Sequence, residues 1–106
     1  MAAIPSGYVN QKQLASDVEQ AKQRLGPDVV RVTHSVGADT SGEPSIFFRI
    51  VLTDSASHED TLADVTGRVA GILFDELRPY ENWGLRPYFS FRSQSEQARR
   101  DDLAWG

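Results

Sequence analysis

The fold of this chain is constrained most by two segments in which apolar and polar side chains alternate. A run of turn-forming residues joins the two segments. Residues 28–36 (DVVRVTHSV) are rich in β-branched types, and residues 45–54 (SIFFRIVLTD) alternate in the same way. Successive side chains of a strand point to opposite faces, so each segment predicts a strand with one apolar face. Residues 37–44 (GADTSGEP) are dense in turn formers, and we therefore expect a long-tipped hairpin.

Helical periodicity precedes this hairpin. Leu14, Val18, Ala21 and Leu25 recur at the spacing of one helical stripe. Asn10 stands just before the stripe, and its side chain suits the capping of free N–H groups in a first turn. The pattern predicts an amphipathic helix after residue 10.

A second helix and a third strand follow the hairpin. An apolar stripe runs over residues 62–77 and ends before Pro79. Gly67 and Gly71 form a G-x-x-x-G pair on this helix, and we expect the pair to mark close approach of the helix to a sheet. Residues 87–93 (PYFSFRS) alternate again and predict the third strand.

The element order α-β-β-α-β predicts an α+β fold, a two-layer α/β sandwich with two helices on one face of a three-stranded, mainly antiparallel sheet. A right-handed crossover makes the third strand parallel to the second. The favoured strand order is 2-1-3, and the order 1-2-3 is the alternative. The residues expected to face the helices are Val30, Val32, Val36, Ile46, Phe48, Ile50, Leu52, Phe89 and Phe91.

With 106 residues, the chain has the size of one domain. We expect residues 1–9 to form a flexible arm, residues 10–93 a single α+β domain, and residues 94–106 a polar C-terminal tail. Leu103 and Trp105 close this tail. Since the apolar stripes of the domain already match one another, we expect these two side chains to anchor in a partner.

Composition excludes several classes of function. The chain has no cysteine, which excludes disulfides, thiolate zinc sites and cysteine nucleophiles. It has no apolar run of membrane-spanning length and no secretory signal at its start, so we expect a cytoplasmic protein without a membrane partner. The net charge is −4, and residues 54–85 hold seven acids but only two bases.

A two-layer sandwich leaves one sheet face uncovered, and this face carries an arginine on each strand beside two aromatic rings. Arginine with aromatic residues is typical of protein–protein hot spots. We therefore predict a non-enzymatic protein-interaction module that binds a partner, or a second copy of itself, through this face and the tail. RNA or single-stranded nucleic-acid binding on the same face is the alternative, because rings stack on bases and guanidinium groups pair with phosphates. The candidate surface comprises Arg31, Phe47, Arg49, Tyr88, Arg92 and Trp105.

Enzymatic chemistry is the third hypothesis. The chain has no phosphate-binding glycine loop, no H-E-x-x-H and no G-x-S-x-G. We expect His34 to be a satisfied histidine of the buried strand face and His58 to be a solvated residue at a helix start. His58 with Asp54 and Glu59 would still need a fourth metal ligand. The sequence therefore predicts no catalytic residue, no metal site and no cofactor.

Two stretches, residues 39–49 (DTSGEPSIFFR) and residues 87–97 (PYFSFRSQSEQ), with the closing Ala104-Trp105, resemble a group of small uncharacterised bacterial proteins. The likeness covers most of residues 28–105, and the string FRSQSEQ is its most specific part. If such proteins neighbour HEPN-domain proteins, the resemblance implies a two-component, toxin–antitoxin-like system with this chain as the partner component. The paired-aspartate nucleotidyltransferase motif of the best-known HEPN companions is missing from this chain.

Overall fold

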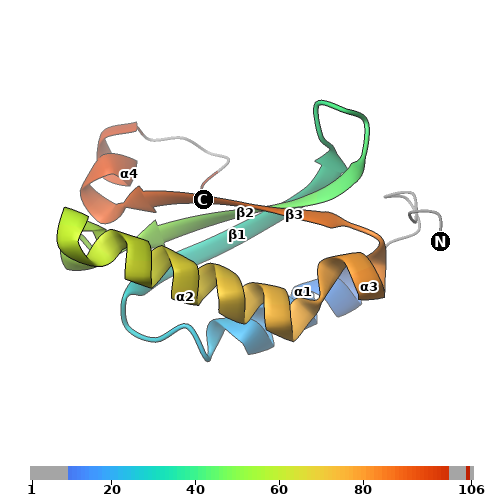
Figure 1. The fold of residues 1–106 in the computed structure, drawn as a ribbon, viewed down its shortest axis with the longest axis horizontal. Coiled ribbons are helices and arrows are strands. Elements are labelled where there is room, and N and C mark those ends of the chain that lie inside the picture. Colours follow the sequence, from blue (N-terminus) through green and yellow to red (C-terminus); the bar gives the residue numbers. More distant parts are fainter. Residues whose placement is uncertain (1–9, 101–104, 106) are drawn as a thin grey trace.

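The computed structural model describes residues 10–100 and Trp105, so the arm predicted at residues 1–9 lies outside the described residues, as does Leu103. Helices α1 and α2 lie on one face of the sheet (Figure 1), and the predicted α+β class is confirmed. The elements in chain order are α1 (Gln11–Lys22), β1 (Val29–Ala38), β2 (Pro44–Leu52), the short 3-10 helix η2 (Ser55–Ser57), α2 (Glu59–Leu77), α3 (Pro79–Trp83), β3 (Arg86–Ser93) and α4 (Gln94–Arg100).

Helix α1 begins as its sequence predicts. The Asn10 side chain accepts a hydrogen bond of 3.0 Å from the backbone N–H of Gln13, which satisfies one of the free donors of the first turn. Leu14, Val18 and Ala21 are the buried residues of the helix. The chain then turns toward β1 through Gly26, whose φ of +83° is a conformation that other residues rarely adopt.

Strand β2 is the centre of the three-stranded sheet. It pairs antiparallel with β1 and parallel with β3, so the predicted order 2-1-3 is wrong and the alternative order 1-2-3 is correct. The physical reason lies in the composition of β2, which is the most completely buried strand and has Phe48 on one face and Val51 on the other at 0% and 3% exposure. A strand that is buried on both faces gains most from a neighbour on each side. Parallel pairing also stacks Phe48 on Phe89, with ring centroids 5.3 Å apart.

A bulge shifts the first residues of β1. The pairing register with β2 changes between Val29 and Arg31. Val29 therefore packs against the core, whereas Val30 is 43% exposed. The expectation that Val30 faces the helices is wrong because a bulge adds one residue that a strict alternation does not contain.

The hydrophobic core fills the space between the sheet and the two helices. Phe48, Ile50 and Leu52 of β2 are fully buried there, while Val36, Phe89 and Phe91 are partly buried and pack against the core. The residues that the helices contribute are Leu14, Val18 and Ala21 from α1 and Val65, Val69, Leu73 and Leu77 from α2.

One flank of α2 is open. A Cβ atom added at Gly67 or at Gly71 would meet no atom of the described residues within 4 Å, apart from the neighbouring backbone of α2 itself. The expectation that this G-x-x-x-G pair marks close approach to the sheet is therefore wrong. Helix α2 is held instead on its α1 side, where Arg68 donates to the Leu25 carbonyl at 2.6 Å and to the Asp28 carboxylate at 3.2 Å.

Candidate interaction surface

The pairing register builds three cross-strand rows on the sheet face that looks away from α1 and α2. Partners directly opposite each other place their side chains on the same face. The aromatic row is Ser35, Phe47 and Tyr88; the central row is Thr33, Arg49 and Ser90; and the covered row is Arg31, Val51 and Arg92.

The aromatic row contains a stacked ring pair. Phe47 and Tyr88 lie on neighbouring strands with ring centroids 5.4 Å apart and planes inclined by 14°. Tyr88 is 38% exposed, and Phe47 is half-buried. The parallel pairing of β2 with β3 brings these two predicted residues together, so the row presents one continuous aromatic surface.

Asp39 fixes the hairpin tip beside this aromatic row. Its carboxylate accepts hydrogen bonds from the Tyr88 hydroxyl at 2.7 Å, from the Ser41 N–H and hydroxyl at 2.9 and 2.7 Å, and from the Glu43 N–H at 3.0 Å. These donors, chiefly the side chains of Ser41 and Tyr88, hold the pKa of the Asp39 carboxyl far below its ordinary range. The Arg86 guanidinium lies 3.8 Å away and adds its positive charge. These bonds therefore fix the conformation of the hairpin tip and join it to β3.

Arg49 occupies the middle of the face. It stands between Thr33 on β1 and Ser90 on β3, both of them short side chains. Its side chain is half-buried, and within residues 10–100 and 105 it makes no hydrogen bond, ion pair or ring contact. Because a guanidinium carries five N–H donors, Arg49 offers donors to a ligand in the middle of this face.

Helix α4 packs against β3 and β2, so with Trp105 it lies over the β3 end of the covered row, whereas Arg31 at the β1 end is exposed. The Arg92 guanidinium stacks on the Trp105 ring at 4.1 Å from its centre, and Arg92 also donates to the Gln97 side-chain oxygen at 3.1 Å. Trp105 is only 8% exposed and Val51 only 3%. Trp105 is thus an anchor in this chain, and the expectation that it anchors in a partner is wrong.

Asp54 holds the start of α4. It accepts from the backbone N–H of Ser95 at 2.9 Å and from the Ser95 hydroxyl, and these two bonds lower the pKa of the Asp54 carboxyl. Ser93 caps the same turn by accepting from the Glu96 N–H at 3.0 Å. This role of Asp54 was not predicted, although the serines after β3 are a signal for a helix start.

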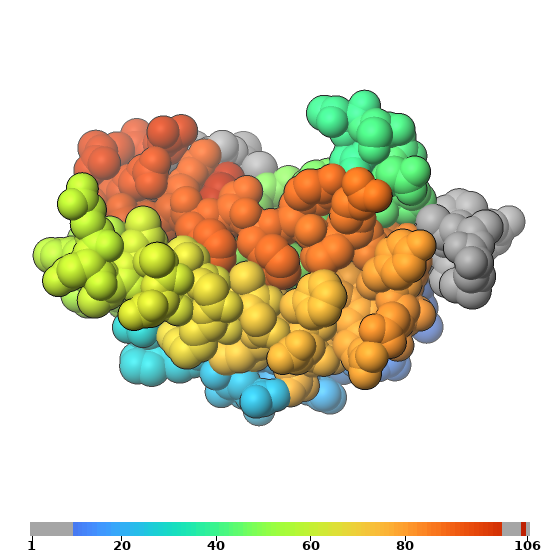
Figure 2. Space-filling model, in the orientation of Figure 1, coloured from blue at the N-terminus to red at the C-terminus, as the bar shows by residue number. Residues whose placement is uncertain are grey.

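The open part of the face is a hollow between two raised elements. Figure 2 shows that the outline of the molecule dips between α4 and the hairpin tip. By register, the aromatic and central rows form the floor of this hollow. Phe47, Arg49 and Tyr88 therefore lie together in the hollow, whereas Arg92 and Trp105 pair at its border and Arg31 lies on the edge strand β1.

The two histidines do not converge with other ligands. Among the described residues, no group of three or more histidine, aspartate or glutamate side chains is placed to hold a metal ion. His34 lies on the helix side of β1 opposite Phe48 and is half-buried. Burial lowers the pKa of its imidazole, and the positive charge of Lys22 lowers it further.

Comparisons with known proteins do not indicate a function, so the functional proposal rests on this surface. No protein-family model, no curated protein and no solved structure matches this chain. Within residues 10–100 and 105, no helix is long and apolar enough to cross a membrane.

Proposed function

We propose that this chain is a non-enzymatic protein-interaction module whose sheet hollow binds an acidic group of a partner protein. The observation that carries the proposal is Arg49, which is half-buried in the middle of the face and whose guanidinium has no partner among the described residues. A carboxylate from a partner satisfies such a group with paired, charge-assisted hydrogen bonds.

The aromatic row supports the same proposal. The stacked pair of Phe47 and Tyr88 lies beside Arg49 on the floor of the hollow. Large rings that are already held in place lose little side-chain entropy on binding, and rings next to an arginine are the composition of interface hot spots. Because Asp39 holds the Tyr88 hydroxyl, this part of the surface is preorganised.

The test compares partner capture by wild type, Arg49→Ala and Lys12→Ala. Lys12 is an exposed residue of α1, so its variant is the matched loss of one positive charge. In cross-linking followed by mass spectrometry of an extract of the source cells, we expect one acidic-surfaced partner to be recovered by wild type and by Lys12→Ala. Arg49→Ala should reduce recovery by about tenfold or more, as loss of a hot spot does. Equal recovery by Arg49→Ala contradicts the proposal.

Self-association is one form of this proposal. If a second copy of the chain is the partner, sedimentation should find a dimer in wild type and a shift toward monomer in Arg49→Ala. If the proteins that this chain resembles neighbour HEPN-domain proteins, an HEPN-domain chain encoded beside this one is another candidate partner. Co-purification of the two chains, lost in Arg49→Ala, is the expected result for that pair.

Nucleic acid is the alternative ligand of the same hollow. Binding of mixed single-stranded RNA at low salt should then weaken steeply as salt rises, and removal of Arg49 should flatten that dependence. Such a result would replace the protein partner with RNA. Absence of RNA binding by wild type at low salt ends the alternative.

A further inference from the structure

Strand β3 has a free edge. It is the outer strand of the sheet, and the described residues pair it only with β2. Alternate residues of a strand direct their N–H and C=O groups to opposite sides, so half of these groups on β3 point away from β2. Pro87 removes one donor near the start of the strand, which leaves the end toward Ser93 as the better pairing edge.

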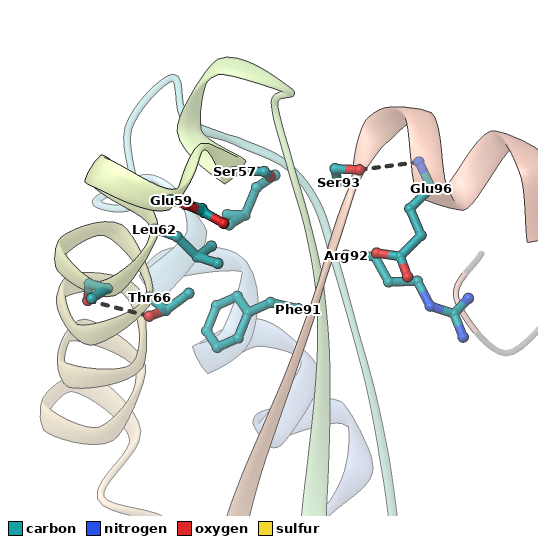
Figure 3. Close-up of a pocket in the computed structure, with 10 residues that line it drawn as sticks. Ser57, Glu59, Leu62, Thr66, Phe91, Arg92, Ser93 and Glu96 are labelled. Atoms are coloured by element: carbon teal, nitrogen blue, oxygen red, sulfur yellow. Dashed lines mark hydrogen bonds between the residues drawn. The ribbon is translucent and has the colours of Figure 1, made fainter.

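A groove runs between this edge and α2. It has a volume of about 730 Å³, and Figure 3 shows Leu62 and Thr66 of α2 pointing toward Phe91 of β3. Leu52 lies at its base, and Ala63 completes the helix wall. The groove is therefore apolar where a side chain from an added strand would enter it.

The helix wall continues beyond the groove. Gly67 and Ala70 follow Ala63 and Thr66 at the four-residue spacing of one helix flank, and Phe74 follows Ala70. Phe74 is 48% exposed and Leu62 is 37% exposed, and the space beside Gly67 is empty among the described residues. This flank of α2 has the length and the smooth apolar surface to cover one more strand beside β3.

The charge around the groove is negative. Glu59 lines it on the α2 side, and Asp60 and Asp64 are exposed on the first turns of the same helix. None of these three acids makes an ion pair within residues 10–100 and 105. Among the described residues that line the groove, Arg92 is the one base, and it directs its guanidinium to Trp105 on the other side of β3. A second copy of this chain would bring the same acids together and repel, whereas a basic segment would be attracted.

We propose that the free edge of β3 and the open flank of α2 bind an extended, apolar segment of a partner protein that carries lysine or arginine. The segment pairs with β3 as a fourth strand, places alternate apolar side chains against Leu62 and Phe91, and sets its basic side chains beside Glu59. Strand addition of this kind takes affinity from main-chain hydrogen bonds and specificity from alternate pockets. The site lies outside the sheet hollow and does not depend on the function proposed for Arg49.

The probe is a short acetylated peptide of alternating valine and threonine with two lysines at each end, so that either strand direction sets lysine beside Glu59. Its counterpart has glutamates in place of the lysines. In amide NMR spectra of the full chain, we expect the lysine peptide to shift the signals of Leu62, Thr66, Phe91 and Ser93 and to slow hydrogen exchange along β3. The glutamate peptide should bind about fivefold more weakly at low salt, which corresponds to the loss of two surface ion pairs.

Ala63→Arg and Ala15→Arg are the matched variants. Both positions are exposed on helices, so both chains should fold with unchanged circular dichroism. Ala63→Arg fills the groove and opposes the lysines, and it should abolish the shifts, whereas Ala15→Arg on α1 should leave them unchanged. The proposal is overturned by an absence of shifts with the lysine peptide, or by shifts at Thr33 and Arg49 instead. It is equally overturned by a wild-type dimer that Ala63→Arg dissociates, since that result assigns the groove to a second copy.

Discussion

The Tyr88 hydroxyl donates a hydrogen bond of 2.7 Å to the Asp39 carboxylate, which joins β3 to the hairpin tip across 49 positions of sequence. Tyr88 also stacks on Phe47, so one side chain connects the hairpin loop, the central strand and the edge strand. The Asp39 carboxylate therefore links the hairpin tip to the floor of the hollow, and the Asp39 side chain is only 7% exposed.

Asp39→Asn should lower the urea midpoint of unfolding at neutral pH. The folded protein holds the pKa of Asp39 below its ordinary value of 3.8, so the carboxylate stabilises the fold fully above that pH. This contribution is lost as the pH falls below 3.8 toward the lower pKa of the folded state. Urea titrations between neutral and acid pH should thus find that acid lowers the free energy of unfolding less in Asp39→Asn than in wild type.

Asp64→Asn is the control for this experiment because Asp64 is exposed on α2 and makes no ion pair within the described residues. It should keep the wild-type urea midpoint at neutral pH. If Asp39→Asn matched this control, the hydrogen bonds of the hairpin tip would contribute nothing to stability.

Phe48→Ala and Phe91→Ala should lower the free energy of unfolding by different amounts. Phe48 is fully buried in the core, so its truncation should lower the free energy of unfolding by about 3–5 kcal/mol. Phe91 is only partly buried and lines the groove beside β3, so its truncation leaves a space that solvent reaches and should cost less. Urea unfolding measures both values. An equal or reversed order would show that the strand faces are assigned incorrectly.

Trp105→Ala should destabilise the isolated chain. Trp105 is buried and receives the Arg92 guanidinium, so its removal exposes apolar surface and ends a cation–π contact. The expected loss is about 1–3 kcal/mol in the free energy of unfolding. Gln20→Ala, at an exposed position of α1, is the control and should leave the urea midpoint unchanged. A Trp105→Ala midpoint equal to that of the control would show that the C-terminal segment does not belong to the fold.

The sequence predicts the faces of the strands well because alternation is a local property. It placed Phe47, Arg49 and Tyr88 on one face, and the register confirms that face. Strand order is not a local property. A third strand that runs parallel to β2 can lie beside β1 or beside β2, and its side chains alternate in the same way in both arrangements. The bulge before Arg31 also escaped prediction, because one inserted residue leaves no mark in a run of valines.

The docking of the C-terminal segment was beyond the sequence for a different reason. Residues 94–100 are polar and show no apolar stripe, so nothing local predicts that they pack on the sheet. Their position depends on Asp54, which lies 41 residues before Ser95, and on the contact of Trp105 with Arg92. Both are tertiary interactions between polar or charged groups, which hydrophobic periodicity does not detect.

His34 should make the fold less stable as the pH falls below neutral. Burial and the positive charge of Lys22 lower the pKa of its imidazole below the ordinary 6.5, so the unfolded chain binds the proton more readily than the folded one. The effect is absent well above pH 6.5, grows as the pH falls through 6.5, and becomes constant below the lower pKa of the folded state. For one proton its slope cannot exceed about 1.4 kcal/mol per pH unit. His34→Gln should flatten urea midpoints measured across this range, whereas Gln20→Ala, at an exposed position of α1, should keep the wild-type slope. A slope that survives in His34→Gln would assign the pH dependence to the carboxylates instead.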